Sequence, residues 1–186
     1  AAFIPNPMSG TTWARGGAVV PNGPINLVTA SNPLGTTGAY VRGVASSSTS
    51  VAKFSPWVGS TGGTEFYTSF KVLFGDSSAG NTATTGTWAF YQGAGTMYSD
   101  ASGFAGSQVF TGIKFTYGAG GALSLNYRLA GADSTSGLTT TTFASGTVYT
   151  IEIVGNNKTS GTINYTYGGV SQSVAVQKFD LFINGT

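Results

Sequence analysis

The feature that most constrains the fold of this chain is a succession of short stretches in which apolar and polar residues alternate. It is clearest from Val148 to Val154, where Tyr149, Ile151 and Ile153 occupy every second position. A period of two places alternate side chains on the same side of an extended backbone, so the run predicts a β-strand with one buried face. From Phe143 to Thr186 we expect three strands in succession, broken by GNNKTSG and YGGVSQS.

The same alternation recurs upstream. It predicts further strands at Glu65 to Phe74, Thr87 to Gln92, Gln108 to Tyr117 and Ala122 to Leu129, the last two joined as a hairpin through GAGG. No stretch of ten residues has a helical period. Many short strands at a spacing of roughly 8–12 residues predict an all-β chain, and we expect an antiparallel two-sheet β-sandwich.

The first 50 residues have a different composition, rich in Gly, Pro, Asn, Ser and Thr. All six prolines fall within the first 56 residues. Proline cannot donate to a central ladder, so edge strands and long loops are expected here. Short strands are predicted around Trp13, at Ile25 to Thr29 and at Ala39 to Val44.

Within this sandwich, the apolar face of each strand predicts the core. We expect it to contain Phe66, Phe70, Val72, Phe74, Trp88, Phe90, Ile113, Phe115, Ile151, Ile153, Phe179 and Leu181.

Length and charge exclude several classes of protein. At 186 residues the chain is expected to form one domain, 1–186. Only 8% of the residues are charged, and the eight basic residues are scattered, whereas a nucleic-acid interface needs a basic cluster. No apolar run approaches the ~18 residues of a membrane span. With no cysteine, disulfides and thiolate metal sites are excluded. The start at Ala-Ala-Phe is typical of a mature product after signal cleavage, and a cut within a longer chain would look the same. Low charge with many Ser and Thr residues is common in secreted surface proteins, so we expect a secreted or cell-surface protein.

The C-terminal end of the chain carries a turn signal. Asn184-Gly185 after an alternating run is a strong hairpin pattern, because this pair supplies positive φ angles. We expect either that the chain is a portion of a longer polypeptide or that a neighbour supplies the pairing strand. The last strand, predicted at Val174 to Ile183, contains no proline, so its edge is also a candidate for self-association.

Several elements resemble the concanavalin-like or laminin-G-like jelly-roll domains of secreted Bacteroidota surface proteins, of the type IX secretion type. They are FSPW, F-x-V-L-F, G-T-W-x-F-Y-Q-G, F-T-G-x-x-F-T and KFDLFINGT, at Phe54 to Trp57, Phe70 to Phe74, Gly86 to Gly93, Phe110 to Thr116 and Lys178 to Thr186. The resemblance covers about 130 residues. It implies a jelly roll with a non-catalytic role in adhesion or carbohydrate binding.

Catalysis is not expected. The chain has no His, which removes the commonest general base and the usual zinc ligands. A glycosidase needs two carboxylates facing each other across the bond, and the only candidates are Glu65 and Glu152, each alone on a predicted strand. We favour outward, solvated carboxylates at both positions.

Calcium is the one cofactor that the sequence leaves open. Asp76 and Asp100 lie in Gly- and Ser-rich loops, where they are candidate ligands together with carbonyl oxygens. The alternative is that both are ordinary turn residues, since Asp caps turns locally.

The aromatic residues provide the best candidate binding site. A sugar has an apolar C–H face and a polar rim, so a tyrosine ring beside an amide or hydroxyl group suits it. Tyr67, Tyr91, Gln92 and Tyr98 have this character and are the predicted ligand-binding residues. Tyr67 is out of phase with the phenylalanines of its strand, so it faces a ligand or solvent. The expected function is an extracellular module that binds glycans or other surface proteins. The alternative is a structural subunit of a filament or surface assembly that shares strands between chains.

Overall fold

The computed structural model describes residues 25–43, 63–75, 86–93, 109–117, 123–129, 132–133, 143–144 and 146–186. The chain divides into two compact units, one formed by Ala1–Ser60 with Gly93–Gln108 and the other by Thr61–Gln92 with Val109–Thr186. The single domain expected from chain length stays a prediction.

In the first unit, the described part is a β-hairpin. Strand β1 (Ile25–Val28) pairs antiparallel with β2 (Tyr40–Gly43), which confirms the two short strands predicted there. The connection is held by Asn32, whose Nδ2 donates to the Thr36 hydroxyl and to the Gly38 carbonyl at 3.0 and 3.1 Å.

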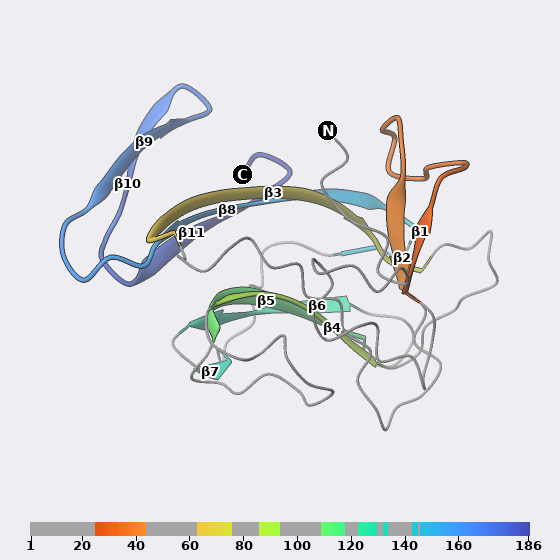
Figure 1. Cartoon of the computed structure of the whole chain (residues 1–186), viewed down its shortest axis with the longest axis horizontal. Coiled ribbons are helices and arrows are strands. Elements are labelled where there is room, and N and C mark those ends of the chain that lie inside the picture. The colour runs from red at the N-terminus through yellow and green to blue at the C-terminus, as the bar shows by residue number, and fades with distance from the viewer. Residues whose placement is uncertain are drawn as a thin grey trace. The chain divides into compact units, whose positions relative to one another are not determined.

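In the second unit, the described strands form three antiparallel arrangements (Figure 1). A three-stranded sheet has the order β11 (Lys178–Ile183), β8 (Val148–Asn156), β3 (Glu65–Leu73). A four-stranded sheet has the order β4 (Gly86–Gly93), β5 (Val109–Tyr117), β6 (Leu123–Leu129), β7 (Ala132–Asp133). Strands β9 (Ile163–Tyr167) and β10 (Val170–Val174) form a separate hairpin. The described residues contain no helix, so the all-β prediction is confirmed, and the arrangement is consistent with a β-sandwich.

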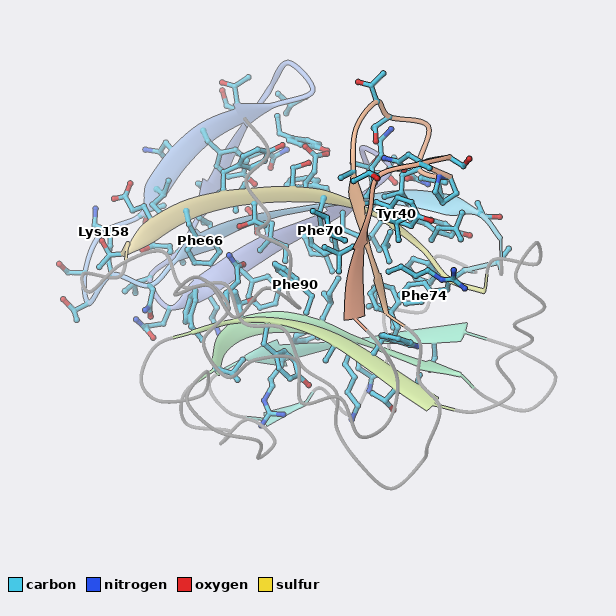
Figure 2. All side chains as sticks on the ribbon, turned by 45° about the vertical axis from the view of Figure 1, so that its right-hand side comes forward. Tyr40, Phe66, Phe70, Phe74, Phe90 and Lys158 are labelled. Atoms are coloured by element: carbon cyan, nitrogen blue, oxygen red, sulfur yellow. The ribbon has the colours of Figure 1, made fainter. Side chains whose placement is uncertain are left out.

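Aromatic side chains from the two larger sheets form one core. Phe70 of β3 lies against Phe90 of β4 with ring centroids 4.3 Å apart, and both point into the space between the sheets (Figure 2). Phe74 packs against Phe115 in the same way, with ring centroids 4.5 Å apart. All predicted core residues are confirmed: Phe74, Ile113, Phe115, Ile151 and Ile153 are buried, and Phe66, Phe70, Val72, Trp88, Phe90, Phe179 and Leu181 pack against them.

The C-terminal quarter corrects two sequence predictions. It contains four strands rather than three, because VSQS of the predicted break YGGVSQS belongs to strand β10. Gly168 and Gly169 both have positive φ, which makes a two-residue turn after which β10 begins at once. The last strand also begins at Lys178 and not at Val174. Gln177 adopts a φ of 58°, and the Lys178 amide donates to the Ala175 carbonyl at 3.2 Å, so the chain turns between β10 and β11.

The predicted Asn184-Gly185 turn is confirmed. Both residues have positive φ, at 53° and 85°. Ile183 and Thr186 exchange backbone hydrogen bonds across the turn, at 2.9 and 3.3 Å. The turn is also tied to β8, because the Thr150 amide donates to the Asn184 side-chain oxygen at 2.8 Å.

We predict that Gly155→Ala destabilises the second unit. A Cβ at this buried position would overlap with the Phe66 ring. Displacing the ring from the core is expected to cost about 1–3 kcal/mol in chemical denaturation. In the double variant with Phe66→Leu, the loss should be smaller than the sum of the two single losses. Simple additivity would show that the alanine and the ring do not compete for space.

Candidate binding face on the three-stranded sheet

The face of the three-stranded sheet that points away from the core carries the candidate site. Phe66 and Phe70 of β3 point inward, so the intervening Tyr67 points outward. Its side chain is 60% exposed, which is exceptional for a large aromatic ring. In register, Glu152 of β8 lies between Ser69 of β3 and Phe182 of β11.

A single carboxylate at this face accepts hydrogen bonds from two tyrosines. The Tyr67 hydroxyl donates to Oε1 of Glu152, and the Tyr167 hydroxyl of β9 donates to Oε2. The two phenols come from different strands, and Glu152 itself is half-buried. The bond from Tyr167 fixes the Glu152 carboxylate, and the bond from Tyr67 to this carboxylate holds the Tyr67 ring at the surface.

The β9–β10 hairpin reaches this face through aromatic contacts. Tyr167 stacks on Phe182, with centroids 3.7 Å apart and an interplanar angle of 16°. Tyr165 packs edge-on against the same ring and donates its hydroxyl to Oδ2 of Asp180 at 2.7 Å. We refer to Tyr67, Glu152, Tyr165, Tyr167, Asp180 and Phe182 together as the tyrosine face.

A buried asparagine fixes the base of the hairpin. Asn156, at the end of β8, has no exposed surface. Its Nδ2 donates to the carbonyls of Gly161 and Val174 at 2.9 and 3.1 Å, and its Oδ1 accepts from the Lys158 amide at 3.1 Å. Both ends of the hairpin are therefore attached to one side chain of the sheet.

The carboxylates raise the pKa of the tyrosines. The hydrogen bond to Glu152 is the main cause that raises the pKa of Tyr167 to about 12, with burial second. The bond to Glu152 likewise raises the pKa of Tyr67, although Ser69 opposes it. For Tyr165, burial is the larger cause of a raised pKa and the bond to Asp180 the next. All three phenols are protonated donors at neutral pH.

The structure does not bring the other predicted ligand-binding residues to this face. Gln92 points inward, where its Nε2 donates to the Thr68 hydroxyl at 2.7 Å. Tyr91, the neighbour of Gln92 on β4, points to the opposite side of its sheet and lies 5.4 Å from the Arg128 guanidinium. Tyr67 and Tyr91 therefore lie on opposite outer faces of the two sheets. Tyr98 lies outside the described residues.

The two carboxylates considered for catalysis share the outer face but are not paired. Glu65 stands opposite Asn156 and Glu152 opposite Ser69, four positions apart along β3. Four strand residues span about 13 Å, which exceeds the separation used by glycosidases. Glu65 is instead ion-paired with Lys158, whose Nζ lies 2.6 Å from its Oε1.

The candidate calcium ligands Asp76 and Asp100 lie outside the described residues, so calcium binding stays a prediction. Within the described ranges, no group of three or more Asp or Glu residues is placed to hold a metal ion. The same ranges hold no helix with the length and apolar character needed to cross a membrane.

The sequence predicts only part of the tyrosine face. Tyr67 was expected from its phase on β3, but Tyr165, Tyr167, Asp180 and Phe182 were missed. The signal was present: the two tyrosines alternate on one face of β9, and Asp180 and Phe182 alternate with the apolar Phe179 and Leu181. The alternation of residue types does not show, however, that the β9–β10 hairpin packs against the three-stranded sheet.

A groove of about 530 Å³ borders the tyrosine face along β11. It is lined by Tyr127, Gln172, Ser173, Lys178, Phe179, Asp180, Leu181 and Phe182. Tyr127 belongs to the four-stranded sheet and packs against Phe179 at 6.0 Å, whereas Gln172 and Ser173 belong to β10. Because β6 lines the groove on the core side of β11 and β10 lines it on the other side, the groove runs along the edge of β11.

Comparisons with protein-family models, with curated proteins and with solved structures found no match to this chain. The function is therefore argued from the geometry of the tyrosine face and of the groove.

We predict that Asn156→Asp loosens the β9–β10 hairpin. The new carboxylate oxygen would face the carbonyls of Gly161 and Val174 in a buried position, and the expected loss of stability is at least about 2 kcal/mol. Amide hydrogen exchange should accelerate in β9 and β10. Asn157→Asp is the matched control, because the Asn157 side chain accepts a bond from Gln177 through Oδ1, which aspartate retains. Equal exchange in both variants would contradict the anchoring role of Asn156.

We predict that Tyr167 titrates near pH 12 in the folded protein. Its folded pKa lies above the unfolded value of ~10, so its bond to Glu152 stabilises fully below pH 10 and the stabilisation is lost between pH 10 and 12. The ultraviolet phenolate absorbance of the wild type minus that of Tyr167→Phe should have its midpoint near 12. A midpoint near 10 would show that the Glu152 bond is absent in solution.

Proposed function

We propose that this chain is a non-catalytic extracellular module that binds carbohydrate, or adheres to glycosylated surfaces, within a larger cell-surface protein. Its sandwich would then be of the concanavalin-like or laminin-G-like jelly-roll type. The observation that carries the proposal is the ring of Tyr67, exposed at the surface and held by Glu152.

The chemistry of the tyrosine face suits a sugar. The exposed ring offers an apolar surface for the C–H face of a pyranose. Ser69 lies two residues along the same face of β3, and Glu152 lies opposite Ser69. The Ser69 hydroxyl and the second lone pair of each Glu152 oxygen can accept hydrogen bonds from the hydroxyl groups of the rim. Because the phenol is already fixed by its hydrogen bond, less side-chain entropy is lost when a ligand binds.

The geometry gives no comparable support to an enzyme. Both oxygens of Glu152 accept phenol hydrogen bonds, and Glu65 is paired with Lys158. A second candidate function is a structural subunit of an extracellular assembly that shares strands between chains. It is favoured by one observation: among the described strands, β11 lies at the edge of its sheet, beside a groove.

We predict that a bound oligosaccharide raises the thermal unfolding midpoint and that Tyr67→Ala abolishes this rise. A ligand at one hundred times its Kd stabilises the folded state by about 2.7 kcal/mol. A panel of oligosaccharides is screened by thermal unfolding, and hits are confirmed by calorimetry. Tyr67→Phe should keep most of the gain, since the ring remains.

Thr166→Ala is the matched control for Tyr67→Ala. Thr166 is exposed on β9 and alternates with Tyr165 and Tyr167, so its side chain points away from the tyrosine face. It should bind as the wild type does. A sugar-induced rise that survives in Tyr67→Ala would move the binding site away from the tyrosine face.

A further inference from the structure

The hydrogen bonds around the Tyr67 ring use the donors of this part of the tyrosine face. The hydroxyls of Tyr67 and Tyr167 both donate to Glu152. Ser69 is also hydrogen-bonded to Tyr67, and because this bond lowers the pKa of the phenol, Ser69 is the donor. Each carboxylate oxygen keeps a second lone pair, and the serine oxygen keeps its own. The polar groups beside the ring are therefore left as acceptors, so a ligand here must supply the donors.

Glu152 also brings a negative charge to the ring. A phenol donates a hydrogen bond but carries no positive charge, and the described side chains that bond to Glu152 are both phenols. The other carboxylate on the outer face of β3, Glu65, differs, because Nζ of Lys158 lies 2.6 Å from its Oε1. Charge complementarity at Glu152 therefore favours a cationic donor from a ligand.

The neighbours of Glu152 along β3 define where such a cation would lie. Tyr67 stands one pair before the Ser69–Glu152 pair on this face, and Lys71 stands one pair after it. The Tyr67 ring is 60% exposed, and the face of an aromatic ring attracts a cation, whereas Lys71 repels one. The favourable position is over Tyr67, on the side of Glu152 away from Lys71.

A sugar ring with a free amino group meets these requirements together. Its C–H face packs on a tyrosine ring, and its ammonium group has three donors and no acceptor. N-acetylation removes the charge and all but one of these donors. A sugar carboxylate or sulfate would add acceptors and a negative charge beside Glu152, which the carboxylate disfavours.

We propose that the tyrosine face binds glycans that carry a free, protonated amino group, with the sugar ring on Tyr67 and its ammonium at Glu152. This inference rests on the proposed function and specifies its substrate class. The ring supplies the contact that any pyranose can make, and the carboxylate selects the amino sugar from neutral and acidic ones.

The test compares two oligosaccharides that differ only in N-acetylation. The whole chain is titrated in a calorimeter, at slightly acidic pH and low salt, with a short β-1,4-linked glucosamine oligomer and with its fully N-acetylated counterpart. The free amine form should bind about fivefold more tightly or better, and the difference should shrink at high salt. The readout is the ratio of the two Kd values within one variant, so it does not depend on how much of that variant is folded.

Three variants locate the preference. Glu152→Gln should bring the ratio close to one, because it removes the charge and keeps the shape of the side chain. Glu65→Gln is the matched control, since it makes the same change in net charge on the same face of β3 and should alter the ratio much less. Lys71→Gln removes a repelling cation and should increase the ratio.

Each result decides between the alternatives. A preference for the free amine that depends on Glu152 and not on Glu65 supports the inference. Equal loss of the preference in both glutamine variants overturns it, because net charge alone then attracts the ligand. A lysine oligomer that binds as tightly as the glucosamine oligomer also overturns it, since the sugar ring then contributes nothing.

The proposed function is tested separately by the other sugars of the panel. Two oligomers that bind equally well, with binding abolished in Tyr67→Ala, overturn the amino-sugar inference and leave the proposed function standing. The same holds if other oligosaccharides bind and neither oligomer does. A chain that binds no sugar overturns both.

Discussion

The pairing of β8 on both of its sides is the constraint on which the rest of the second unit depends. Strand β8 bonds to β3 along one edge and to β11 along the other. Its inward residues Ile151 and Ile153 are fully buried, and each such side chain contributes about 1.5–3 kcal/mol on leaving water. The opposite face of the same strand presents Glu152 to the tyrosines. The core and the candidate site are thus built on the two faces of one strand, β8.

Much of this architecture follows from the alternation of residue types. Strands β3, β5, β6 and β8 coincide with predicted strands to within two residues at each end, because one buried face imposes a strict period of two. The predicted core is confirmed for the same reason. The prediction erred where a turn was shorter than its sequence suggested: Gly168-Gly169 needs only two residues, so VSQSV forms a strand.

The candidate site was less predictable than the core. Tyr67 follows from its phase on β3, a local property. The donation of Tyr167 to Glu152 depends on how the β9–β10 hairpin returns onto the sheet, which is set by the buried Asn156 at its base. A single buried polar side chain of this kind has no periodicity, and a local pattern therefore does not reveal it. The same holds for Gln92, whose inward direction depends on Thr68 of another sheet.

Because Glu152 uses one oxygen for Tyr67 and the other for Tyr167, the surface ring and the hairpin are energetically linked through one carboxylate. A ligand that takes the Tyr67 hydroxyl from Glu152 would leave this carboxylate with one phenol donor. The remaining hydrogen bond from Tyr167 would then be strengthened. The same hairpin rests its aromatic rings on Phe182 of β11. A displacement of the Tyr67 hydroxyl would therefore reach β11 through Glu152, Tyr167 and Phe182 in turn.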